Sequence, residues 1–125
     1  MSTTDETIEQ EIQAKGLTAP RVTPADIEAN IASEHYFTAS DGVVGATAAL
    51  TGQALGGITY EIPPLHLLTF CVLVLRNSFT VTGESACASP ENFDAGVGRK
   101  IARQNAVQKI WPLMGYELRS KLANK

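Results

Sequence analysis

Residues 67–113, LLTFCVLVLRNSFTVTGESACASPENFDAGVGRKIARQNAVQKIWPL, carry the clearest pattern in the chain and decide its fold. An apolar strand at about 67–76, an Asn-Ser turn and an alternating strand at 79–84 predict a β-hairpin. The hairpin runs through a short polar elbow into one long amphipathic helix. Because both faces of the first strand are apolar, we expect helices to cover one face and a partner or a second layer to cover the other.

The polar elbow is the segment SPENFD, residues 89–94, which joins the hairpin to the helix. Ser89 is a candidate cap for a separate helical turn, and Asp94 is a second candidate cap for the main helix. The amide of Asn92 and the ring of Phe93 suit the binding of a base and a phosphate at a helix start. Phe93 could instead be a hydrophobic plug beneath the helix, and the pattern leaves both interpretations open.

The helix after the elbow carries the basic residues of interest. Arg99 and Arg103 lie one turn apart on one face, where both guanidinium groups could meet one anionic group. A solvated helix face is the alternative interpretation for each of these cations. The helix is predicted to end at Trp111, because Pro112 follows.

Three small residues, Gly98, Ala102 and Ala106, recur every four residues along the same helix. Such a row lets another backbone approach closely, so it predicts a helix–helix contact, either within the fold or across a dimer axis. Charged residues make up only 18% of the chain, which favours a homo-oligomer. We therefore assign this row to the oligomer interface.

The N-terminal region is patterned more weakly than the hairpin. Residues 1–22 form a polar arm with a weak helical pattern at about 5–15, which we expect to be flexible or docked on another subunit. Residues 23–122 are predicted to form a single α+β domain. It begins with a short helix at about 24–33, for which Thr23 is the cap. The fold class is thus an antiparallel hairpin or small sheet packed against a long C-terminal helix, with a short N-terminal helix.

The segment between the short helix and the hairpin is irregular. Its aromatic content predicts a strand at residues 34–38, with Phe37 as a core anchor and His35 at the surface. Residues 41–60 are rich in Gly, Ala and Thr and carry no charge after Asp41. They predict a long loop with no stable element of its own, either a tolerated insertion or a segment that packs against a symmetry mate.

Composition and charge exclude several classes of function. The formal net charge is −3, and the basic residues gather in the C-terminal helix, which suits a small anionic ligand better than duplex nucleic acid. The longest apolar run, residues 67–75, is too short to cross a membrane, and the N-terminus lacks the pattern of a secretory signal. We therefore expect a soluble protein of a reducing compartment with no membrane partner.

The sequence shows no catalytic set and no metal-binding spacing. His35 and His66 fit no zinc motif, and Cys87, the more exposed thiol, has no base to activate it. Neither a P-loop nor a dinucleotide-binding fingerprint is present. We expect a protein that is not an enzyme and that uses no metal and no cofactor.

The run TFCVLVLRNSFTVTGESACASPENFDAGVGRKIARQNAVQKIWPLMGYEL, residues 69–118, resembles a small family of tailed-phage proteins. The segment IEANIASEHYFTASDGV, residues 27–43, resembles the N-terminal part of the same family, so the resemblance covers about residues 27–122. Within this family we place the first Thoeris anti-defence proteins, which act as sponges for bacterial immune signals.

The resemblance implies a protein of the host cytoplasm that sequesters cyclic ADP-ribose isomers, the signals of TIR-based Thoeris immunity, without cleaving them. It also implies homo-oligomers (dimers or hexamers), pockets where subunits pair, and separate sites for cyclic oligonucleotides in some members. On this interpretation Arg99 and Arg103 hold phosphate, Asn92 reads a base or ribose edge, and Phe93 or Phe79 stacks on a base. The alternative is a protein-binding module that inhibits a host factor through the apolar hairpin face and takes no small ligand.

Overall fold

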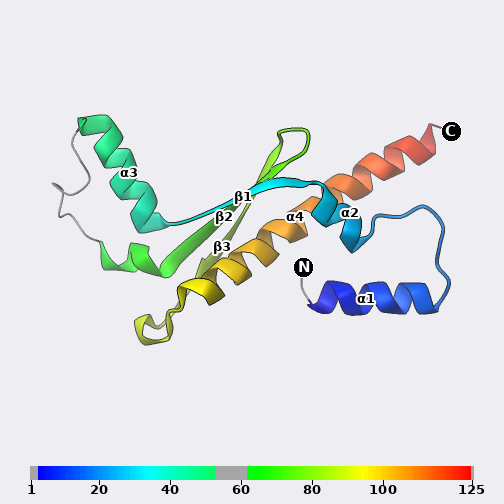
Figure 1. Cartoon of the computed structure of the whole chain (residues 1–125), viewed down its shortest axis with the longest axis horizontal. Helices are drawn as coiled ribbons and strands as arrows, with labels where there is room; N and C mark the ends of the chain where they lie inside the picture. The colour runs from blue at the N-terminus through cyan, green and yellow to red at the C-terminus, as the bar shows by residue number, and fades with distance from the viewer. Residues whose placement is uncertain (1–2, 53–61, 125) are drawn as a thin grey trace.

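The computed structural model of the chain describes residues 3–52 and 62–124. Within these residues, three antiparallel strands pack against one long C-terminal helix, and a short helix lies near the N-terminus (Figure 1), which confirms the predicted α+β class. In chain order the elements are α1 (Thr3–Ala14), α2 (Pro24–Ala29), β1 (Ile31–Thr38), α3 (Ala39–Thr51), the 3-10 helix η2 (Pro63–Leu67), β2 (Leu68–Leu75), β3 (Thr80–Ala86), the 3-10 helix η3 (Pro90–Asn92) and α4 (Ala95–Ala123).

The sheet has β2 at its centre, with β1 and β3 paired antiparallel on its two sides. Tyr36, Cys71 and Gly83 lie in register across the three strands, on the inner face that α4 covers. Burial alternates strictly along β2, because every second side chain enters the core. The core consists of the buried apolar residues Ile27, Cys71, Leu73, Leu75, Val81, Ala102, Ala106, Val107 and Ile110.

The row of small residues on α4 faces the sheet of its own chain. A Cβ added at Gly83 would collide with the carbonyl oxygen of Ala102 and the amide nitrogen of Ala106, so the two backbones are in direct contact. A Cβ at Gly98 would lie 3.0 Å from Oγ1 of Thr69. The close approach expected from this row therefore occurs between helix and strand within one chain. A dimer axis requires a different surface, because Ala102 and Ala106 are fully buried.

The predicted end of the C-terminal helix at Trp111 is wrong, because α4 continues through Pro112 to Ala123. Pro112 has no N–H to donate to the carbonyl of Gln108, which costs one backbone hydrogen bond. Packing on both sides of the proline compensates for this loss. Ile110 is buried in the core before it, and Met114 packs against the core after it.

The predicted loop at residues 41–60 is wrong for its first half, which forms the helix α3. A capping box starts this helix: the side chain of Thr38 accepts a hydrogen bond from the N–H of Asp41, and the carboxylate of Asp41 accepts one from the N–H of Thr38. Gly52 ends it in the left-handed conformation with φ of 70°. Residues 53–60 of the predicted loop lie outside the described part of the chain.

The outer face of the sheet holds Phe37, which was predicted to anchor the core. Phe37 is 38% exposed and stacks on Phe70 of β2, with ring centroids 5.3 Å apart. The strand prediction itself is confirmed, although β1 begins earlier, at Ile31, because α2 already ends at Ala29. His35 lies exposed on the same outer face, as expected, and its ring contacts the Ser33 hydroxyl at 3.0 Å.

The N-terminal helix α1 docks on its own chain in the structure. Arg21 donates two hydrogen bonds to the Glu9 carboxylate, at 2.6 and 2.7 Å, and Gln108 of α4 donates to Asp5 at 3.2 Å. A cavity of about 230 Å³ remains between α1 and α4, with Trp111 in its wall. No helix in the described ranges is long and apolar enough to span a membrane.

Candidate functional site

The elbow between β3 and α4 forms the two turns that the sequence predicts. Ser89 precedes the 3-10 helix η3, although its side chain makes no capping hydrogen bond. Asp94 caps α4, because its Oδ1 accepts a hydrogen bond from the N–H of Val97 at 2.9 Å. This carboxylate sits at the positive end of the helix dipole. An anionic ligand at the elbow therefore has to be held by side chains rather than by the start of α4.

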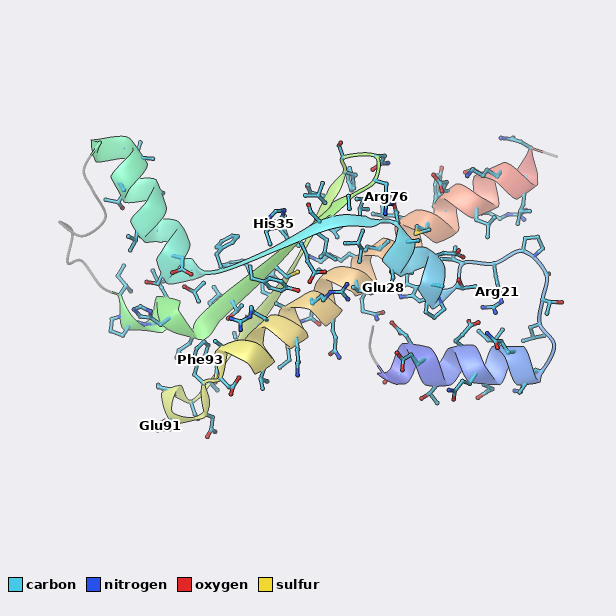
Figure 2. The ribbon with its side chains drawn as sticks, viewed as in Figure 1. Arg21, Glu28, His35, Arg76, Glu91 and Phe93 are labelled. Atoms are coloured by element: carbon cyan, nitrogen blue, oxygen red, sulfur yellow. The ribbon has the colours of Figure 1, made fainter. Side chains whose placement is uncertain are left out.

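Phe93 is half-buried and lies between two hollows, at the place where α4 begins beside the sheet (Figure 2). The larger hollow has a volume of about 220 Å³ and is mainly apolar. Its lining consists of Leu67, Ser85, Ala86, Cys87, Asn92, Phe93, Asp94, Val97, Gly98 and Ile101. The smaller hollow, of about 90 Å³, is lined by Tyr36, Phe37, Thr38, Asp41, Thr69, Phe93, Ala95 and Arg99. Phe93 is therefore partly packed beneath the start of α4, and it also lines both hollows.

Arg99 brings an exposed positive charge to the smaller hollow. It makes no hydrogen bond or ion pair with any described residue. Asp41 lines the same hollow from the start of α3, and its Oδ2 is used in the capping box. The hollow therefore offers a guanidinium donor, a carboxylate acceptor and an aromatic ring within one small space.

Arg103, the second predicted phosphate ligand, is held by two carboxylates. Its two terminal nitrogens donate to Glu28 of α2 at 2.8 and 3.1 Å, and its Nε donates to Glu34 of β1 at 3.1 Å. These hydrogen bonds raise the pKa of Arg103, and they hold the pKa of the Glu28 carboxyl below its usual value. Arg103 therefore ties α4 to α2 and β1, and the expected pair of arginines does not converge on one anion.

Tyr36 extends this network on the inner face of the sheet. Its hydroxyl donates to Glu34 at 2.9 Å, so Glu34 accepts from both Tyr36 and Arg103. Burial, assisted by the hydrogen bond to Glu34, raises the pKa of the Tyr36 hydroxyl. The chain Tyr36, Glu34, Arg103, Glu28 is consequently a structural network beside the smaller hollow.

The structure brings together three of the five predicted ligand residues. Asn92 and Phe93 line the larger hollow, and Phe93 and Arg99 line the smaller one. Phe79 is 56% exposed and precedes β3, so it lies at the hairpin tip, at the other end of the sheet from the elbow (Figure 1). Asp41 was missed by sequence reasoning. The signal that could have found it is the Thr38-x-x-Asp41 capping box, which predicts a helix start at this place.

The thiols and carboxylates of the described residues form no metal centre. No group of three or more His, Cys, Asp or Glu with metal-binding geometry occurs in that part of the chain. Cys71 packs in the core as predicted, and burial raises the pKa of its thiol. The Cys87 thiol donates to the carbonyl oxygen of Ser89 at 3.2 Å, within the wall of the larger hollow.

Comparison with known proteins gives one match. The model of a family described as phage protein (N4 Gp49/phage Sf6 gene 66) matches residues 22–122. The matched region contains α2, the whole sheet, the elbow and nearly all of α4, and it excludes α1. No curated protein and no solved structure matches the chain.

Proposed function

Because the chain belongs to the phage protein family of N4 Gp49 and phage Sf6 gene 66, we propose that it is a phage anti-defence protein that acts in the host cytoplasm. Its ligand is a cyclic ADP-ribose isomer, the signal of TIR-based immunity, which it binds and sequesters without cleavage. The support for this ligand is the resemblance to the Thoeris anti-defence proteins, together with the chemistry of the smaller hollow. Cyclic oligonucleotides at separate sites are a further ligand class that the resemblance implies.

The observation that carries the proposal is the placement of Arg99, Asp41 and Phe93 around one hollow. A guanidinium fork matches a phosphate oxygen pair, and Arg99 has no carboxylate partner to compete for it among the described residues. A carboxylate such as that of Asp41 accepts hydrogen bonds from ribose hydroxyls. The ring of Phe93 stacks on adenine, and Asn92 on the other side of the ring donates or accepts at a base edge.

The two hollows are small for such a ligand, which supports a homo-oligomer. Their volumes of about 220 and 90 Å³ both fall below the roughly 300 Å³ at which ligand pockets usually begin. A second copy of the chain would have to supply the remaining wall. This agrees with pockets formed where subunits pair.

Calorimetric titration of matched variants tests these roles. Arg99→Met removes the phosphate donor and leaves the structural network of Arg103 intact, so the dissociation constant should rise about 30-fold or more. Arg119→Met, on the exposed C-terminal part of α4, is the control and should bind as tightly as the wild type. Equal affinity of Arg99→Met and Arg119→Met would refute the assignment of the site.

The alternative function, inhibition of a host factor through the hairpin, has one observation in its favour. Phe79 stands exposed at the hairpin tip, away from both hollows. On this account Phe79→Ala abolishes capture of a host protein from infected-cell extract, whereas Arg99→Met leaves capture unchanged. If the protein is instead a sponge, Arg99→Met loses binding of the nucleotide, whereas Phe79→Ala still binds it.

A further inference from the structure

The N-terminal helix α1 covers a groove that is formed beside α2 and α4. Four residues line this groove, which we call the α2–α4 groove: Val22, Pro24, Gln108 and Trp111. Helix α1 reaches it through the connector of residues 15–23 (Figure 1). The fit is loose, because a cavity of about 230 Å³ remains between helix and groove, and no residue from 4 to 14 is fully buried. Helix α1 is therefore a cover on the fold and no part of its core.

Trp111 shows that α1 is an incomplete match for the groove. The indole Nε1 of Trp111 is buried, and no described residue accepts a hydrogen bond from it. A buried indole N–H normally has a partner, because leaving the donor unpaired costs its free energy of hydration. Ile8, which lines the same cavity, is still 54% exposed. Helix α1 thus covers the groove but leaves both a donor and an isoleucine unsatisfied.

The polar contacts of α1 indicate which chemistry the groove accepts. Arg21 donates to both oxygens of the Glu9 carboxylate, at 2.6 and 2.7 Å (Figure 2). Gln108 donates to Asp5 at 3.2 Å. With the indole N–H of Trp111, the groove therefore offers three donors around an apolar surface. Asp5 and Glu9 lie four residues apart on one face of α1, so an acidic amphipathic helix meets two of these donors at once.

We propose that the α2–α4 groove is a docking surface for an acidic amphipathic helix of another protein, and that α1 occupies the groove until such a helix displaces it. An amphipathic helix in an apolar groove is a common mode of recognition, with apolar anchors at spacings of three and four residues. Ile8 and Ile12 have this spacing, and α1 carries four carboxylates and no basic residue. The partner helix shares these features and adds an acceptor for the indole N–H of Trp111.

The groove is separate both from its cover and from the candidate ligand site. The family match over residues 22–122 contains all four groove residues and excludes α1. The groove also shares no residue with the two hollows at the elbow. The docking surface therefore stands if the proposed nucleotide ligand fails, and the nucleotide site stands if the docking surface fails.

A charge reversal on α1 tests whether the helix is a removable cover. Glu9→Arg removes the acceptor of Arg21 and brings two cations together, so α1 should leave the groove. Trp111 is the one tryptophan of the chain, and its emission should shift to the red while a cooperative thermal transition is retained. Glu11→Arg is the matched control. It makes the same change of charge on α1, but Glu11 pairs with Lys15 outside the groove, so the emission should stay as in the wild type.

Titration with a synthetic peptide of residues 3–16 then tests the groove as a docking surface. The peptide should return the emission of Glu9→Arg to that of the wild type, with a dissociation constant of about 0.1 mM. The wild type should bind the peptide about 10-fold more weakly, because its own tethered α1 competes at an effective concentration of about 1 mM. A peptide with lysine at the four acidic positions is the control and should not bind.

Each other result overturns a stated part of the proposal. An unchanged emission in Glu9→Arg would show that α1 is no removable cover. Release of α1 without binding of the acidic peptide would show that the groove is no docking surface. Equal binding of the acidic and the lysine peptides would contradict the charge match. A wild type that sediments as a dimer, and becomes monomeric in Glu9→Arg, would assign the groove to α1 of a second copy instead.

Discussion

Replacing Arg103 by methionine tests the interpretation that this arginine is structural. The substitution removes the guanidinium group that the carboxylates of Glu28 and Glu34 share, so both lose their hydrogen bonds to Arg103. The side chains of Arg103, Glu28 and Glu34 are 21%, 35% and 40% exposed. Exposed ion pairs contribute about 0.2–1 kcal/mol, and loss of one partner of a buried pair costs about 3–5 kcal/mol. For this intermediate site we expect Arg103→Met to lower the free energy of unfolding by about 2 kcal/mol.

Urea unfolding, followed by circular dichroism and by the fluorescence of Trp111, measures this loss directly. Arg99→Met is the control, since it removes an arginine one turn away that has no partner among the described residues, and its effect should stay within about 0.5 kcal/mol. In the double variant with Glu28→Gln, the two losses should not add. Equal destabilisation by Arg99→Met and Arg103→Met, or none by Arg103→Met, would refute the network.

The pH dependence of the same experiment has a definite sign. The hydrogen bonds from Arg103 hold the pKa of Glu28 below its usual value of 4.5, so the folded state binds this proton less readily than the unfolded chain. The Arg103–Glu28 pair therefore contributes fully to the free energy of unfolding above about pH 4.5, and its contribution declines as the pH falls below that value. The difference between wild type and Arg103→Met should therefore be constant from pH 7 to pH 5 and shrink toward pH 3.

Three further predictions concern the fold. Gly83→Ala should lower the free energy of unfolding by about 3 kcal/mol or prevent folding, because a Cβ there collides with the backbone of α4. Gly45→Ala in α3 is the control: its Cβ meets no atom within 4 Å, so the variant should be more stable by about 0.5 kcal/mol. Thermal unfolding distinguishes the two variants. Pro112→Ala should raise both the helical circular dichroism signal and the melting temperature, since it restores a backbone donor inside α4. An unchanged melting temperature would indicate that the helix ends before residue 112. Arg21→Gln should lower the free energy of unfolding at neutral pH, because hydrogen bonds from Arg21 and Gln13 lower the pKa of Glu9 from 4.5 to about 2. The difference in stability between wild type and variant should shrink as the pH falls from 4.5 toward 2. A difference in urea unfolding that is independent of pH would contradict the Arg21–Glu9 pair.

The parts of the fold that could be predicted are those with local signals. The hairpin follows from alternation and a turn, and the start of α4 follows from the cap at Asp94. The start of α2 follows from the same kind of signal, since Thr23 and Asp26 form a capping box. In each case the residues that determine the structure are neighbours in the sequence, so a single sequence contains the needed information.

The parts that could not be predicted depend on residues far apart in the sequence. Arg103 pairs with Glu28, which lies 75 positions earlier, so no local pattern distinguishes this arginine from Arg99. The row of small residues on α4 predicts a close approach of another backbone, but no local pattern identifies that backbone as Gly83 of β3. Helix α4 likewise continues beyond Pro112 because of tertiary packing, although a proline usually ends a helix.

The most direct test of the proposed function is a calorimetric titration of the wild-type chain with purified cyclic ADP-ribose isomers, followed by heat denaturation and identification of the released molecule. The account predicts saturable binding, loss of this binding in Arg99→Met, and recovery of the intact cyclic ligand. Recovery of an opened or cleaved product would show that the chain is an enzyme. The absence of binding to every isomer would contradict the sponge and favour inhibition of a host factor.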